Sequence, residues 1–214
     1  MKALKVLLLL AFGLSGLHAA QAQQRLRLIG EIVAAAPGSL TVKTRDGQAQ
    51  AVRLADQVRV VAVSQVTAAA IRETNFVAVT AVPQADGSLL ASVVNIFAES
   101  MRGLGEGHYP MANLPGSTMT NATVATIANT MTNATVAAAS DQSGARRVAL
   151  RYKGGEKFAV IPANLPVTLY ENGDRSLLTP GAQVVVNATR GGDGALVSAS
   201  VSVGKNGSLP STLR

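Results

Sequence analysis

The feature that most constrains the fold of this chain is an internal repeat. Residues 77–96 align with residues 184–203 without a gap, at an offset of 107. Seven of the twenty aligned positions are identical, and an Asp-Gly pair falls at the same point in both copies. Weaker matches continue upstream, where residues 40–47 parallel 148–155 and 52–54 parallel 159–161. Self-similarity at a fixed offset is typical of tandem structural units, so we expect two related domains.

Each copy has the pattern of β-structure. Short runs alternate apolar and polar residues, and turn pairs such as Asp46-Gly47 and Asn172-Gly173 separate them. Such pairs favour β-hairpins because glycine adopts the positive φ that tight turns require. The sequence predicts one short helix, at residues 65–72, where alanines favour helix.

Within residues 196–203 the serines alternate with apolar residues. We therefore expect a serine face in water and an apolar face in the core, made by Val197, Ala199, Val201 and Val203. By the repeat, the inward residues of the first copy are Leu90, Val94 and Ile96.

These elements outline an all-β protein of two tandem small β-barrels. Three or four strands, a short helix or turn and two further strands resemble the oligonucleotide/oligosaccharide-binding (OB) fold. We expect the first OB-like barrel at 23–97, a Gly/Met/Thr-rich connector at 98–132, the second barrel at 133–205 and a tail at 206–214. Copies of about 70 residues are marginal alone, so we expect the barrels to pack together.

The first 22 residues have the order of a secretory signal peptide. Lys2 and Lys5 precede an apolar run at 6–17, and Ala20 and Ala22 supply small residues before a cleavage site. The apolar run is shorter than the roughly 20 residues that a spanning helix needs, and no later segment is long enough. We therefore expect cleavage after Ala22 and a periplasmic or secreted protein. Removing two lysines leaves a net charge of 17 − 12 = +5.

The chain also resembles a known family. Gly30-Glu31-Ile32-Val33, the strand at 40–43, the segment 76–81 with Asp86-Gly87, and the block Gly105-Glu106-Gly107-His108 resemble the bacterial exported domain-of-unknown-function 5666 family. The resemblance covers nearly all of residues 29–203. It implies small β-barrels and an envelope location, and it implies no established activity. Tyr109-Pro110-Met111-Ala112 stands where the family pattern has a Trp and an acid after the proline.

The connector holds the unusual residues of the chain. Residues 118–125 recur identically as 130–137, and 134–139 is the expected first strand of the second barrel. The connector also holds His108, the one histidine beyond residue 22, and the methionines Met101, Met111, Met119 and Met131. Thioether and imidazole ligands suit copper, which predicts a metal site at Glu106, His108, Met111 and Met101. The alternative is that the methionines fill the junction between barrels.

The densest basic cluster is Arg146, Arg147, Arg151, Lys153 and Lys157. It predicts either a solvated face or a site for an anionic envelope component, bound by charge attraction that salt weakens. Another envelope protein is the alternative partner. Nucleic acid is not the expected partner, because export removes it and stacking platforms need aromatic residues. Aromatic residues make up only 3% of the chain, and we assign the phenylalanines to the core.

Catalytic patterns are scarce. The chain has no cysteine, and it lacks a Gly-x-Ser-x-Gly elbow, a phosphate-binding loop and a His-Glu-x-x-His pair. Glu99 and Glu106 are the pair that could serve a glycan-active enzyme. The sequence therefore predicts a non-catalytic binding or structural module of the cell envelope without a cofactor, with periplasmic copper binding as the alternative.

Overall fold

The computed structural model describes residues 24–129, 144–205, 207 and 208 of the chain. Within these residues the protein is all-β. The strands are β1 (Arg25–Ala36), β2 (Ser39–Thr44), β3 (Ala49–Val66), β4 (Phe76–Pro83), β5 (Leu89–Ile96), β6 (Gly107–Pro110), β7 (Thr118–Asn129), β8 (Arg146–Tyr152), β9 (Gly155–Ile161), β10 (Val167–Asn172), β11 (Gln183–Arg190) and β12 (Leu196–Gly204). The 3-10 turns are η1 (Ala68–Ala70), η2 (Glu99–Met101) and η3 (Arg175–Leu177). None of the described helical segments is long and apolar enough to cross a membrane.

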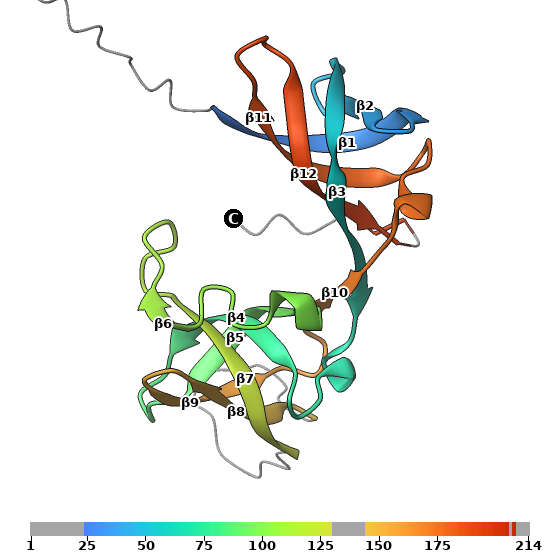
Figure 1. The fold of residues 1–214 in the computed structure, drawn as a ribbon. Helices are drawn as coiled ribbons and strands as arrows, with labels where there is room; N and C mark the ends of the chain where they lie inside the picture. Colours follow the sequence, from blue (N-terminus) through green and yellow to red (C-terminus); the bar gives the residue numbers. More distant parts are fainter. Residues whose placement is uncertain (1–23, 130–143, 206, 209–214) are drawn as a thin grey trace, which may run out of the picture.

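Five strands close into a barrel, which we call the first lobe (Figure 1). They pair in the order β1-β2-β3-β12-β11, and β11 returns to pair with β1. The β3–β12 pair is parallel and the other pairs are antiparallel. Apolar side chains from all five strands fill the interior, including Ile32, Val42, Val52, Val186 and Val201.

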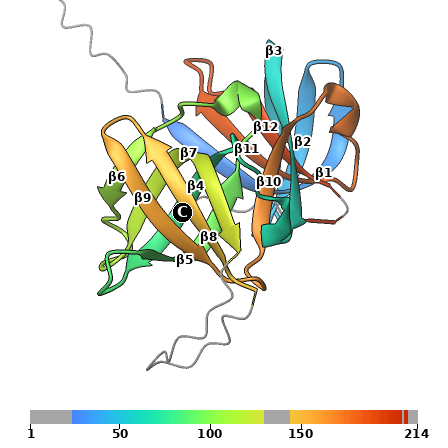
Figure 2. The same ribbon diagram turned by 90° about the horizontal axis from the view of Figure 1, so that it is seen from below.

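The other strands form the second lobe (Figures 1 and 2). Here β7-β8-β9-β5-β4 pair in that order, and β4 returns to β7, so the pairings again make a ring. β10 lies beside β5, and β6 pairs with β7. The core of this lobe includes Val79, Val94, Val124, Leu150 and Ile161.

The two lobes exchange strands between the halves of the sequence. The first lobe combines β1, β2 and β3 with the late hairpin β11–β12, whereas the early hairpin β4–β5 joins β7, β8 and β9. The expected ranges 23–97 and 133–205 therefore do not close on themselves. The same strand order arises in each lobe, but its strands come from both halves.

Strand β3 links the lobes. Its first part pairs with β2 and β12 in the first lobe, and residues 61–66 pair antiparallel with β10. A third group of buried side chains, which we call the seam cluster, lies beside this ribbon and consists of Val61, Val63, Phe76, Ala78, Phe97 and Tyr170. Phe97 is 5.9 Å from Phe76 and 5.6 Å from Tyr170, measured between ring centroids. The cluster therefore packs the β3–β10 ribbon on β4 and Phe97 of the second lobe through apolar and aromatic side chains, and β1, β2, β11 and β12 of the first lobe contribute no side chain to it.

The predicted helix at 65–72 is reduced to η1. Gln65 and Val66 still belong to β3, and Thr67 at the N-cap makes no side-chain hydrogen bond to the turn. The β-branched Val66 and Thr67 favour extended backbone, which shortens the helical segment from its N-terminal side.

A bulge changes the expected faces of β12. The pairing with β11 shifts between Ser198 and Ser200, and Ala199 is the extra residue. Val201 and Val203 are buried as predicted, but Ser198 is buried too, whereas Val197 and Ala199 are not. The hydroxyl of Ser198 donates to the Asn187 carbonyl at 2.8 Å, which satisfies it inside the lobe.

The hairpin β4–β5 has the same irregularity at the repeat offset of 107. Its pairing shifts at Thr80/Ala81, where that of β11–β12 shifts at Asn187/Ala188. Val94 and Ile96 point inward as predicted, but Leu90 is only partly buried and pairs with the exposed Val82.

The expected connector contains two strands. β6 and β7 fall within 98–132, and β7 lies between β4 and β8 as a full member of the second lobe. The first copy of the duplicated segment, at 118–125, thus supplies this strand. The second copy at 130–137, with Met131, and the whole of the expected strand at 134–139 lie outside the described residues, as do residues 1–22.

The strand exchange predicts a specific cross-link. Arg53 on β3 lies opposite Val197 on β12, and neighbouring strands are about 4.8 Å apart, within the range a disulfide needs. Because the chain has no native cysteine, Arg53→Cys with Val197→Cys should form an intramolecular disulfide, detected by peptide mapping without reductant. The matched pair is Arg53→Cys with Leu90→Cys, since 90 is 197 − 107. Its formation instead would show that each half closes on itself.

Replacing the buried, unpaired Asn95 side chain should stabilise the protein. Its side chain is 1% exposed, and neither its oxygen nor its nitrogen has a hydrogen-bond partner. A buried polar group without a partner costs about 1–3 kcal/mol, so Asn95→Leu should raise the free energy of unfolding by a similar amount in urea titrations. Asn187→Leu, at an exposed strand position, should change it by less than about 0.5 kcal/mol. A loss of stability in Asn95→Leu would contradict this reading.

Candidate functional site

The five basic residues predicted as one site are divided between the two faces of the β8–β9 hairpin. Side chains alternate along a strand, so Arg147 and Arg151 share the outer face while Arg146 lies on the other. One Arg146 nitrogen donates to the carbonyls of Ala68 at 2.6 Å and Ile71 at 3.0 Å. Arg146 therefore ties β8 to the η1 turn and lies away from the outer face that carries Arg147 and Arg151.

Lys153 and Lys157 lie near the end of the same hairpin. The backbone N–H of Lys153, which follows β8, donates to Glu106 Oε1 at 2.9 Å. Lys157 pairs with Leu150, a core residue, and so faces the interior side of the strand near His108. The predicted cluster thus leaves Arg147 and Arg151 as the basic pair of the outer face.

The outer face of β8–β9 carries an exposed aromatic ring. Phe158 is 41% exposed, and the guanidinium carbon of Arg147 lies 4.8 Å from its ring centroid. That separation is a cation–π contact. Ala149, directly opposite Phe158, is small. The assignment of all phenylalanines to the core is therefore wrong for Phe158, although Phe76 and Phe97 are buried.

Apolar side chains continue from Phe158 across the neighbouring strands. Val160 pairs with Leu90 on β5, and Leu90 pairs with Val82 on β4, which is 44% exposed. We call this surface the Arg147–Phe158 face, and it comprises Val82, Leu90, Arg147, Arg151, Phe158 and Val160. The hairpin β8–β9 lies on the side of the second lobe turned away from the first lobe (Figures 1 and 2).

Two carboxylates modify the charge of this face. Glu156 forms an ion pair with Arg151 at 3.2 Å, in which the arginine side chain stays 72% exposed. Hydrogen bonds from the side chain and backbone of Ser88, with a smaller contribution from the charge of Arg147, hold the pKa of Asp86 below its usual value. Arg147 therefore has a stacked ring and a nearby charge but no direct ion pair among the described residues.

The residues predicted to hold copper lie on different sides of β7. His108 pairs with Thr120, and its Nδ1 lies 2.8 Å from the Thr120 hydroxyl. Its ring stacks on Tyr152 with the centroids 6.2 Å apart. Met101 instead packs on the seam cluster together with Met119, the neighbour of Thr120 along the strand. Because neighbouring strand residues point to opposite faces, Met101 and His108 lie on opposite sides of β7.

The candidate ligand Met111 is partly buried in the loop after β6. Met119, a connector methionine outside the predicted site, accepts a hydrogen bond from the Thr80 hydroxyl at 3.7 Å. Packing on the seam cluster supports the alternative reading for Met101 and Met119, namely that they fill a junction. No group of three His, Cys, Asp or Glu side chains in the described ranges is placed to hold a metal. Copper binding stays a prediction.

Glu99 and Glu106 have separate partners. Glu99 forms an ion pair with Arg102, and this contact holds the pKa of Glu99 below its usual value. Glu106 accepts from the Lys153 backbone. Glycoside hydrolysis requires one carboxyl group with a raised pKa as the proton donor, and Glu99 has the opposite shift.

A scan against protein-family models, a search of curated proteins and a search of solved structures each found no match to this chain.

The environment of His108 predicts a pH dependence of stability. Burial, and then the charge of Lys157, lower the pKa of His108 below its ordinary value. The unfolded chain therefore takes up a proton before the folded protein does, so the free energy of unfolding should fall as pH decreases from about 7.5 to about 5.5. Urea titrations across this window should show a flatter dependence for His108→Gln. Equal slopes in both proteins would contradict the assignment.

Proposed function

We propose that this protein is an exported, non-catalytic binding module of the bacterial cell envelope, and that the Arg147–Phe158 face binds an anionic glycan. The observation that carries the proposal is the Arg147 guanidinium stacked on a Phe158 ring that is 41% exposed. An exposed aromatic ring beside a guanidinium serves both parts of such a ligand, since the ring contacts apolar sugar faces and arginine binds carboxylate or phosphate groups.

The shape of the face supports an extended ligand. Its apolar residues span three neighbouring strands, β4, β5 and β9, with arginines on β8 beside them. Arg147 and Arg151 are four residues apart on one strand, which places them about 13 Å apart along it. Two cations at this separation match repeated charges along a polymer better than a single small anion.

The strand order supports an OB-type binding surface. In each ring, three consecutive antiparallel strands are followed by the second strand of a separate hairpin, which pairs parallel to the third strand. These parallel pairs are β3–β12 in the first lobe and β9–β5 in the second. OB folds bind oligosaccharides and oligonucleotides on the face of their second and third strands. In the second lobe those positions belong to β8 and β9.

Duplication explains how one chain came to have two such lobes. The hairpins β4–β5 and β11–β12 share their register and their bulge at an offset of 107. We propose that the copies arose as tandem repeats and exchanged hairpins. The signal peptide expected at residues 1–22, the net charge of +5 after its removal and the resemblance to the exported family support an envelope location.

Charge reversal tests the proposed face. The probe is purified lipopolysaccharide, with polygalacturonate as a phosphate-free polyanion, and binding is measured by calorimetry. Arg147→Glu should weaken binding at least about tenfold and reduce its dependence on salt. Phe158→Ala should also weaken binding, since it removes the stacked ring but no charge.

The control is Arg59→Glu, which makes the same change in charge at an exposed position on β3 in the first lobe. Arg59→Glu should leave the affinity within about twofold. An equal loss in both charge variants would show that net charge alone drives binding. Absence of binding to both polymers would overturn the proposal. Arg146 is left unchanged because it holds the η1 turn.

A further inference from the structure

A second site-like feature lies in the first lobe, far from the Arg147–Phe158 face in the fold. One end of the barrel opens into a pocket of about 400 Å³. It is bounded by the start of β1, the β2–β3 turn and the junction of β11 with β12. A volume of this size is within the range of small-molecule sites in proteins.

The pocket arises because the inward-facing residues of three strands, β2, β3 and β11, change from apolar to polar at the same end of the barrel. On β2 the buried Leu40 and Val42 are followed by Thr44. On β3 the inward position before Val52 is Gln50, which pairs with Val42.

The third row is on β11, where Ala188 is followed by Arg190. The alternation of β11 is unbroken, because the bulge lies on its partner β12, so Arg190 continues the inward row. Three polar side chains therefore converge on the opening from three strands.

One side of the pocket is apolar. Leu28 and Leu196 are 8% and 5% exposed and belong to the core of the first lobe, and Leu26 packs against that core. The pocket therefore combines an apolar side with polar and charged groups, which suits a ligand that has both an apolar and an anionic part.

Positive charge surrounds the opening. Arg27, Arg45 and Arg190 line it, against a single carboxylate from Asp46. In the described part of the chain, Arg45 makes no ion pair, and Arg190 donates to the Gly194 carbonyl at 2.8 Å. Asp46 is engaged by the hydroxyl of Thr44. The opening thus has an excess of guanidinium groups.

The corresponding end of the second lobe is filled. There Tyr152 and Lys157 occupy the positions of Thr44 and Gln50, and His108 from β6 stacks on Tyr152. β6 pairs with residues 118–121 of β7, which correspond to residues 26–29 of β1 when the bulges of the two strands are aligned. Residues 26–29 line the pocket. The first lobe is therefore open where the second is closed by its own chain.

We propose that this pocket binds a small amphiphilic organic anion, whose carboxylate, sulfonate or phosphate group contacts Arg45 and Arg190 while its apolar part packs on Leu26, Leu28 and Leu196. This site is separate from the Arg147–Phe158 face and does not depend on the function proposed there.

The probe is 1-anilinonaphthalene-8-sulfonate, an amphiphilic anion whose fluorescence rises in apolar surroundings, titrated into the full-length protein purified after export. We expect saturable binding of one equivalent. Arg45→Gln with Arg190→Gln should weaken it at least tenfold. N-phenyl-1-naphthylamine, which has the same rings without the sulfonate, should bind at least tenfold more weakly to the unsubstituted protein.

Two controls locate the site. Arg59→Gln and Arg147→Gln each remove one positive charge elsewhere, and both should leave the affinity within twofold. In the unsubstituted protein, the probe should shift the methyl resonances of Leu28 and Leu196, a readout that does not depend on any variant folding.

Four results would overturn the proposal. Three are no binding of the sulfonate, equal binding of the neutral compound, and unshifted Leu28 and Leu196 methyls. The fourth is loss of binding in Arg147→Gln with retention in Arg45→Gln with Arg190→Gln, which would place the anion on the other face.

Discussion

The continuity of β3 is the constraint on which the rest of the structure depends. The strand runs for 18 residues without a turn, although its pairing with β12 shifts between Leu54 and Arg59. Its last residues, 61–66, leave the first lobe to pair with β10, so the chain that follows begins in the second lobe. The hairpin β4–β5 is then too far to close the barrel that β1, β2 and β3 began, and β11–β12 takes that place. Both rings of strand pairs follow from this one extended segment.

Much of the local structure could be predicted from the sequence, and the pairing of the elements could not. Turn pairs such as Asp86-Gly87 and Asp193-Gly194 mark real hairpins, because their glycines adopt a positive φ. The alternation of apolar and polar residues does not reveal which hairpin joins which lobe, because β4–β5 and β11–β12 have the same pattern of inward positions. The bulge at Ala199 has no sequence signal either, and it reverses the alternation that would otherwise bury Val197.

The basic cluster is not a single site for a related reason: adjacent residues such as Arg146 and Arg147 point to opposite faces. The same alternation could have placed Phe158 outside, because Ala159 and Ile161 are the inward residues of β9.

The seam cluster concentrates the few aromatic residues at the β3–β10 ribbon that links the lobes. Three of the six aromatic residues beyond residue 22 are Phe76, Phe97 and Tyr170, and all three pack there. Met101 and Met119 fill the edges of this cluster, as flexible thioethers do in irregular gaps. Asn95 on β5 pairs directly with Ala78 of the cluster on β4, and its side-chain amide has no hydrogen-bond partner. Apolar packing thus stabilises the seam, while the buried amide opposes it.

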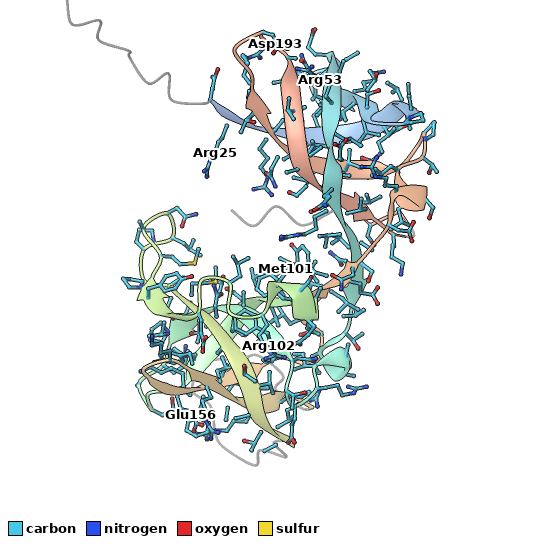
Figure 3. All side chains as sticks on the ribbon, viewed as in Figure 1. Arg25, Arg53, Met101, Arg102, Glu156 and Asp193 are labelled. Atoms are coloured by element: carbon cyan, nitrogen blue, oxygen red, sulfur yellow. The ribbon has the colours of Figure 1, made fainter. Side chains whose placement is uncertain are left out.

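Both proposed sites lie where the two lobes differ. On the outer face of the first lobe, Arg53 forms an ion pair with Asp193 at 2.6 Å. Figure 3 shows these two side chains side by side at the end of that lobe. The corresponding position on β9 is Val160, beside Phe158, so only the second lobe has an apolar face there. At the barrel end the difference is reversed, because His108 and Tyr152 fill the second lobe while Thr44 and Gln50 leave the first open. If duplication produced two equal lobes, each then retained one of two possible surfaces, and the strand exchange holds these surfaces on one continuous framework.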